Sequence, residues 1–182
     1  ALASPSGKSA ISVFRISGKN SKKVIKKITK IRNLQKIKAN TPKLIKIYAD
    51  KDKKKLLDKA MFTYFKEPKS YTGEDLVEIY THGSLSVISG LTSTLEETKL
   101  CRMAEQGEFT RRAFENNKLD LTQVEAVADI ISSETKTQRE MALKQLEGSF
   151  SKKINLWSKK IKKILANFEA AIDFVEEDIP DD

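Results

Sequence analysis

GEFTRRAFENNKLDLTQVEAVADII, residues 107–131, marks the point at which the character of the chain changes. Beyond the start of this stretch the only glycine is Gly148, no proline occurs before Pro180, and good helix formers dominate. Ahead of it, short β-branched runs alternate with stretches of helical periodicity. The sequence therefore predicts an α+β domain with a mixed or antiparallel sheet over residues 1–118, followed by an all-α segment over residues 119–182.

Apolar and β-branched runs in the first domain predict its strands: residues 10–17 (AISVFRIS), 43–48 (KLIKIY), 59–65 (KAMFTYF) and 76–80 (LVEIY). The charged run 50–55 predicts an exposed hairpin tip, which makes the second and third strands an antiparallel pair. Apolar periodicity predicts one helix over about residues 20–29, which Asn20 or Ser21 can cap, and another over about residues 83–95.

A second apolar pattern occupies the end of the chain. Its members recur at alternating four- and three-residue steps: Phe150, Ile154, Trp157, Ile161, Ile164, Phe168 and Ile172. This spacing is typical of a coiled-coil or bundle seam, which must pack against other helices. Since little chain remains to cover the seam, we expect missing sequence or a partner subunit, and residues 176–182 indicate a linker.

Composition excludes several classes of protein. With 39% hydrophobic and 32% charged residues and no apolar run of roughly 18 to 20 residues, the chain has the features of a globular protein that does not enter a membrane. Residues 1–7 lack the pattern of a signal peptide, so we expect a cytoplasmic protein. The single Cys101 excludes an internal disulfide, and with the single His82 a Cys/His zinc site has too few ligands. We expect His82, which precedes a turn, to be structural.

The charge of the chain is unevenly distributed. Its net charge is +9 and its pI is near 9.5, with lysines crowded into residues 19–59 and an acidic end over residues 169–182. The basic segment has two interpretations, a solvated face or a surface that attracts phosphates by counterion release. Charge alone does not decide between them.

Residues 4–9, SPSGKS, end like a nucleotide-binding P-loop. That motif needs a glycine five residues before Gly7, where Leu2 stands, and it needs a helix afterwards, where a strand is predicted. GTP hydrolysis is therefore not assigned to these residues.

Two charged residues stand inside otherwise apolar strands. Arg15 belongs to AISVFRIS and Glu78 to LVEIY, and a charge on a buried strand is costly unless it is paired or used. Both residues could point to solvent, they could pair with each other, or they could bind a ligand.

Three stretches together resemble the MnmE (TrmE) family of tRNA-modification GTPases: residues 107–131, residues 70–83 (SYTGEDLVEIYTHG) and residues 3–18 (ASPSGKSAISVFRISG). The resemblance implies an amino-terminal domain similar to folate-dependent aminomethyltransferases, which binds a formyl-tetrahydrofolate and forms a homodimer. It also implies a helical domain interrupted by a Ras-like GTPase domain. Because residues 173–182 resemble the stretch just before that insertion, we expect the chain to stop before the GTPase domain.

The resemblance assigns three folate contacts. Arg15 matches the arginine of the family's opening strand, Glu78 matches the glutamate that follows its GED segment, and Lys118 matches the lysine of its NxKLDL stretch. A carboxylate can accept paired hydrogen bonds from the amino and ring N–H groups of a pterin, while Arg15 and Lys118 can meet the ligand's carbonyls or carboxylates. We expect the three to converge on 5-formyl-tetrahydrofolate or a related folate. No catalytic residue and no metal site is expected here, because GTP, Mg²⁺ and K⁺ would belong to the absent GTPase domain.

The same resemblance implies a role for the whole protein. With MnmG, a partner that uses FAD and NADH, the whole protein would modify position 5 of the wobble uridine (U34) in certain tRNAs. It would bind these tRNAs through its complex with MnmG. The chain departs from the family's usual motifs at Ser84, where a second glycine is usual after His82-Gly83, and at Gln106, where proline usually precedes Gly-Glu.

Two alternative functions stay open. A stand-alone folate-dependent transferase would need a general acid or base, which these motifs do not identify. A basic RNA-binding module would use residues 19–59, although Tyr48 is the only aromatic residue there to stack on bases.

Overall fold

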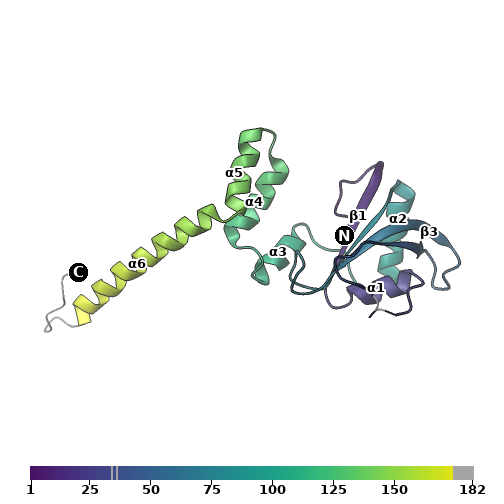
Figure 1. Ribbon diagram of the computed structural model, residues 1–182, viewed down its shortest axis with the longest axis horizontal. Coiled ribbons are helices and arrows are strands. Elements are labelled where there is room, and N and C mark those ends of the chain that lie inside the picture. The colour runs from purple at the N-terminus through teal and green to yellow at the C-terminus, as the bar shows by residue number, and fades with distance from the viewer. Residues whose placement is uncertain (34, 36, 174–182) are drawn as a thin grey trace. The chain divides into compact units, whose positions relative to one another are not determined.

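The computed structural model describes residues 1–33, 35 and 37–173. The chain divides into two compact units, and the boundary in the sequence falls between Leu119 and Asp120. The elements of the first unit are β1 (Ser9–Ser17), α1 (Ser21–Ile28), β2 (Lys43–Tyr48), β3 (Leu56–Phe65), β4 (Leu76–Gly83), α2 (Leu85–Glu97) and α3 (Glu108–Glu115) (Figure 1). The second unit contains α4 (Leu121–Ser132), α5 (Lys136–Leu146) and α6 (Ser149–Asp173). An α+β domain followed by helices is what the sequence predicts, and this fold class is confirmed.

The four strands form one antiparallel sheet in the order β1-β4-β3-β2. The predicted antiparallel pairing of β2 with β3 is thus confirmed. Strand β3 begins at Leu56, three residues before the predicted start, because Asp58 interrupts the apolar run without ending the strand. The carboxylate of Asp58 accepts a hydrogen bond from the backbone amide of His82 at 2.9 Å, which ties β3 to the end of β4.

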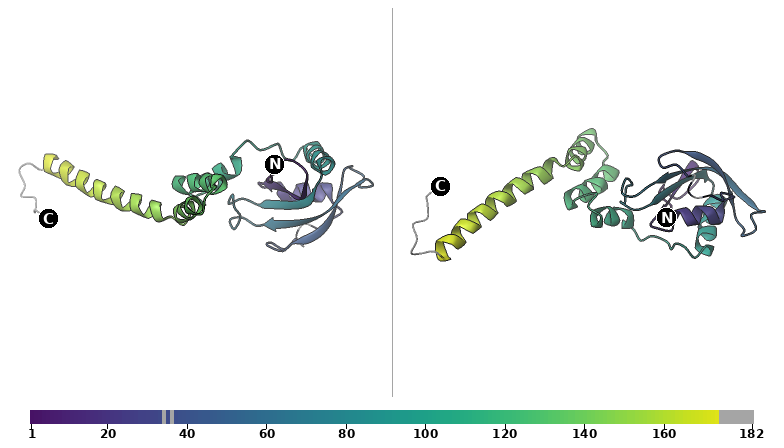
Figure 2. Two further views of the ribbon diagram at one scale, coloured as in Figure 1. Left: turned by 90° about the horizontal axis from the view of Figure 1, so that it is seen from above. Right: turned by 60° about the horizontal axis from the view of Figure 1, so that its bottom comes forward.

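Helices α1 and α2 contact each other, and both pack against β4 (Figure 2). The helices and the facing side chains of the sheet bury a common core: Phe14, Ile16, Val24, Ile25, Ile28, Ile45, Ile47, Ala60, Phe62, Tyr64, Val77, Ile79, Leu91 and Leu95. Successive side chains of a strand point to opposite faces. The neighbours of the core residues on each strand, Arg15 and Glu78 among them, therefore lie on the other face of the sheet.

Capping of α1 differs from the prediction. The backbone of Asn20 is already helical, with φ −94° and ψ −3°, and its side chain makes no cap hydrogen bond. A capping side chain needs an extended backbone to reach back to the helix amides. The side-chain amide of Asn20 instead donates to the backbone carbonyl of Leu100 at 3.4 Å. The hydroxyl of Ser21 has no hydrogen-bond partner among the described residues. The prediction that either residue caps this helix was wrong.

Residues 4–9 do not form a P-loop. Strand β1 begins at Ser9, directly after the Gly7-Lys8 pair, so no helix follows the motif to present its amides to a phosphate.

In the second unit, capping boxes open α4 and α5. Asp120 caps α4 with Gln123, and Thr135 caps α5 with Gln138. The apolar seam predicted on residues 150–172 lies on α6, and its side chains are exposed by 38% to 71% within this chain. The linker predicted for residues 176–182 lies outside the described residues. None of the described helices is both long and apolar enough to cross a membrane.

Candidate functional site

Arg15 and Glu78 form a direct pair across the sheet. They are opposite each other in the β1–β4 register, 63 residues apart in sequence, and the Nε–H of Arg15 donates to Oε1 of Glu78 at 2.7 Å. The side chain of Glu78 is 13% exposed and that of Arg15 is 36% exposed. Of the explanations that the sequence left open, pairing is therefore confirmed, and the pair still reaches solvent.

Two tyrosines complete the surroundings of the pair. Tyr80, two residues after Glu78 on the same face of β4, donates its hydroxyl to Oε2 of Glu78. Burial, and then the hydrogen bond to the Glu78 carboxylate, raises the pKa of Tyr80 to about 12, so it stays a neutral donor near pH 7. On the other side, Cζ of Arg15 lies 5.7 Å from the ring centroid of Tyr71, within cation–π range.

The pair keeps unused capacity for hydrogen bonds. A carboxylate offers about four lone-pair sites, and each oxygen of Glu78 accepts one hydrogen bond here. Among the described residues, Arg15 makes its side-chain hydrogen bond through Nε, which leaves its terminal N–H groups available. The geometry therefore presents a carboxylate with free acceptor sites beside a guanidinium with free donors.

Lys118 follows α3 in the chain and lies against the loop that precedes β4. Its Nζ donates to the carbonyl of Pro68 at 3.1 Å, and Asn116 donates to the carbonyl of Thr72 at 2.7 Å. No hydrogen bond or ion pair between described residues joins Lys118 to Arg15 or Glu78. The structure thus brings two of the three predicted site residues together and connects the third only through the loop.

A network of ion pairs fixes α3 near this loop. Glu108, which is 3% exposed, accepts hydrogen bonds from Arg102 at 2.7 and 2.9 Å and from Arg112 at 2.7 and 3.1 Å. Arg112 also donates to Glu74 at 2.9 and 3.2 Å, and the hydroxyl of Ser17 donates to the same carboxylate at 2.7 Å. The end of β1, the loop before β4 and α3 are therefore held together by charge-assisted hydrogen bonds.

A cavity of about 240 Å³ opens beside Arg15. Its walls come from the end of β1, the start of α1, residues 100–104 and α3, and they include Ser21, Arg102 and Arg112. Glu78 and Lys118 do not line it. Ligand pockets are typically about 300 to 1,000 Å³, so this cavity can take only part of a folate-sized molecule.

His82 behaves as a residue that supports the sheet. Its Nδ1 lies 2.7 Å from Oδ1 of Asp58, whose side chain is 8% exposed, while the imidazole itself is largely exposed. No group of three or more His, Cys, Asp or Glu side chains within the described ranges could hold a metal ion.

Sequence reasoning did not single out Tyr80, Tyr71 or Arg102. Tyr80 could have been found from strand alternation, because it shares the face of Glu78 two residues away. Arg102 stands in an irregular segment between α2 and α3, where no periodicity indicates its direction.

Comparison with known proteins identifies both parts of the chain. Residues 1–118 match the family model described as the N-terminus of the GTP-binding protein TrmE, and residues 121–182 match that of the MnmE helical domain. The whole chain is 42% identical to the tRNA modification GTPase MnmE of Pelagibacter ubique and 45% identical to that of Rickettsia akari. It covers 40% of the length of each of these relatives.

Proposed function

Since the chain belongs to the MnmE (TrmE) family of tRNA-modification GTPases, we propose that its first unit binds a formyl-tetrahydrofolate and forms a homodimer. Arg15, Glu78 and Lys118 are the proposed folate contacts, with the pterin edge on Glu78. The observation that carries this proposal is the pair of Arg15, 36% exposed, and Glu78, 13% exposed, with its unused donors and acceptors.

Binding at Glu78 does not require the pair to separate. Two adjacent N–H groups of a pterin can approach the two oxygens of the carboxylate while Arg15 and Tyr80 keep theirs. The terminal N–H groups of Arg15 can then meet a carbonyl or carboxylate of the same ligand. Lys118 could join them by exchanging its bond to the carbonyl of Pro68 for the ligand.

Homodimerisation is supported by the face of the sheet that α1 and α2 leave uncovered. Leu44, Met61, Tyr80 and Val13 lie opposite one another across the four strands. Leu44 is 75% exposed and Met61 is 38% exposed. An apolar row of this kind is typical of a surface that a second chain covers. Since Glu78 shares this face with Tyr80, a second copy would also cover the proposed folate site.

For the whole protein we propose modification of the wobble uridine of certain tRNAs at position 5. A GTPase domain, which the relatives' name implies, and MnmG, the FAD- and NADH-using partner, would supply the remaining steps, and folate would supply the one-carbon unit. This chain's part would be to position the folate, to dimerise, and to connect the sheet domain to the helices.

Calorimetric titration with 5-formyl-tetrahydrofolate tests the folate site. The unaltered chain should bind in the micromolar range, about −8 kcal/mol, and Glu78→Gln and Arg15→Ala should each abolish measurable binding. The matched control is the exposed pair of Arg111 and Glu115 on α3, 3.9 Å apart, whose variants Arg111→Ala and Glu115→Gln should bind normally. Unchanged affinity in Glu78→Gln would show that the site lies elsewhere.

Sedimentation velocity tests the dimer. Met61→Asp places a charge in the apolar row and should convert dimers into monomers. Met141→Asp, at an exposed position on α5, is the control and should sediment like the unaltered chain. Dimers that persist in Met61→Asp would exclude this face as the interface.

A further inference from the structure

A second feature of the first unit, the basic surface, lies on α1, the segment that follows it, β2 and the hairpin between β2 and β3. We define it by the bases that line two adjoining grooves of about 600 Å³ each: Lys23, Lys26, Lys27, Lys30, Arg32, Lys43, Lys46, Lys51 and Lys53. The grooves share Tyr48, and their lining contains two acids, Asp50 and Glu97. Nine bases against two acids leave seven net positive charges here, whereas the whole chain carries nine.

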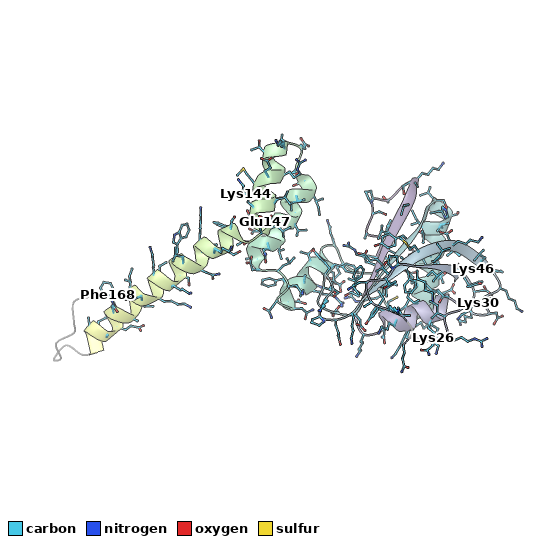
Figure 3. All side chains as sticks on the ribbon, viewed as in Figure 1. Lys26, Lys30, Lys46, Lys144, Glu147 and Phe168 are labelled. Atoms are coloured by element: carbon cyan, nitrogen blue, oxygen red, sulfur yellow. The ribbon has the colours of Figure 1, made fainter. Side chains whose placement is uncertain are left out.

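The fold holds these bases together from separate parts of the sequence. A β-bridge between Thr29 and Ile47 joins the end of α1 to β2. The Nζ of Lys53, in the hairpin, donates to the carbonyl of Lys26 at 2.8 Å. Figure 3 shows Lys26, Lys30 and Lys46 along one edge of the domain. The surface is therefore built into the fold and is not a loose run of lysines.

The positive charge of this surface is not neutralised within the described part of the chain. None of its nine bases makes an ion pair there. The Asp50 carboxylate accepts hydrogen bonds from the backbone amides of Lys55 at 2.7 Å and Lys54 at 3.0 Å, so it stabilises the hairpin turn. Burial, followed by the neighbouring charges of Lys26, Lys27 and Lys30, lowers the pKa of Lys53. Like charges held this close repel one another until an anion binds.

We propose that the basic surface binds the phosphodiester backbone of RNA. Phosphates spaced along a chain match a series of ammonium groups along two grooves, and their binding releases condensed counterions. Tyr48 is the only aromatic residue among the described residues that line the grooves. It is buried, and Lys30 Nζ lies 4.8 Å from its ring centroid. No ring is thus offered for base stacking, and contact with the backbone is the chemistry that remains.

RNA as the source of the phosphates rests on the proposed function, since relatives of this chain are tRNA modification GTPases. The surface itself is independent of the folate site. None of Arg15, Glu78 and Lys118 lines either groove. One activity can therefore fail while the other persists.

Fluorescence anisotropy with a labelled RNA hairpin, the anticodon stem and loop of a tRNA with a wobble uridine, tests the proposal across a salt series. The triple variant Lys26→Gln, Lys30→Gln, Lys46→Gln removes three exposed charges from the surface. The slope of log affinity against log salt should become shallower by about 2 to 3, and affinity at moderate salt should fall at least roughly tenfold. The control, Lys159→Gln, Lys160→Gln, Lys163→Gln on α6, loses the same charge from exposed positions and should bind like the unaltered chain.

Three other results of these measurements would bear on the basic surface. Equal losses in the two triple variants would overturn the proposal, because binding would then follow net charge alone. The proposal would also be overturned if the chain bound vesicles of phosphatidylserine and phosphatidylcholine but not the RNA hairpin, and if vesicle binding were lost in the Lys26→Gln, Lys30→Gln, Lys46→Gln variant. The surface would then be assigned to lipid. Folate titration of the same variant should be unchanged, and a chain that binds RNA without binding folate would disprove the proposed function but support this surface.

Discussion

Replacing Glu108 by Gln removes the carboxylate on which α3 and the segment before it converge. Its oxygens accept hydrogen bonds from Arg102, from Arg112 and from the backbone amide of Glu105. A glutamine keeps the shape but carries no charge, offers one acceptor oxygen, and turns an NH₂ group toward the guanidinium donors. Arg112 would keep its pair with Glu74, whereas Arg102 would lose its carboxylate. The first unit should therefore lose stability.

The size of the loss follows from burial. Removing one partner of a buried ion pair costs about 3 to 5 kcal/mol. Because Arg102 is 63% exposed and Arg112 is 30% exposed, their solvation by water offsets part of this free-energy cost. We expect a decrease of about 2 to 3 kcal/mol in the free energy of unfolding.

The loss should depend on pH in a defined direction. Hydrogen bonds from Arg102, from the amide of Glu105 and from Arg112 lower the pKa of Glu108 from 4.5 to about 2. A carboxylate whose pKa is lower in the folded state stabilises fully above its unfolded pKa, and the stabilisation disappears as the pH falls through the folded pKa. The difference between the unaltered chain and Glu108→Gln should be constant from about pH 5 to 7 and shrink toward about pH 2.

Urea denaturation followed by near-UV circular dichroism measures this difference. All four tyrosines lie before Leu119, and the single Trp157 lies on α6, so the tyrosine signal reports the first unit. With a slope of about 1 to 3 kcal/mol per molar urea, the midpoint should fall by about 0.7 to 3 M. Glu115→Gln, at an exposed position of the same helix, should change the free energy by less than about 0.5 kcal/mol. If Glu108→Gln unfolds at the same urea concentration as Glu115→Gln at pH 7, the network does not stabilise the fold.

Three further substitutions test separate parts of the structure. Gly83→Ala should destabilise the first unit by about 1 to 3 kcal/mol in urea denaturation, because the new Cβ would lie 2.5 Å from the carbonyl oxygen of Ser9. Tyr80→Phe removes the hydroxyl that donates to Glu78, and calorimetry should show folate affinity weakened up to about tenfold. Asp120→Ala removes the capping box of α4 and should cost the second unit about 1 kcal/mol, measured by thermal unfolding followed through Trp157 fluorescence.

Local pattern was sufficient for most elements of the fold. Residues 43–48 (KLIKIY) form a short apolar run rich in isoleucine, and β2 covers this range. The start of β3 was missed because Asp58 looks like a break in the sequence, although it is kept in the strand by bonds from His82, 24 residues away. The predicted cap of α1 was wrong for a related reason, since the side chain of Asn20 donates instead to Leu100, 80 residues away in the sequence.

The candidate site could be predicted only in part. Arg15 and Glu78 stand out as charges in apolar strands, but their partnership depends on a register between strands 63 residues apart. Lys118 was predicted through motif resemblance alone, and no periodicity indicates where its side chain lies. Non-local geometry of this kind arises from sheet order and loop path, which local propensity does not encode.

The pairing of Arg15 with Glu78 also determines which substitution tests the site most cleanly. Arg15→Ala leaves Glu78, which is 13% exposed, without its cation, so a loss of folate binding in that variant combines a missing contact with an unpaired, largely buried carboxylate. Glu78→Gln leaves the more exposed guanidinium, which water can solvate, and Gln still accepts a hydrogen bond from it. The expected stability cost is therefore smaller for Glu78→Gln, and a loss of folate affinity in that variant would measure the carboxylate's contact with the ligand.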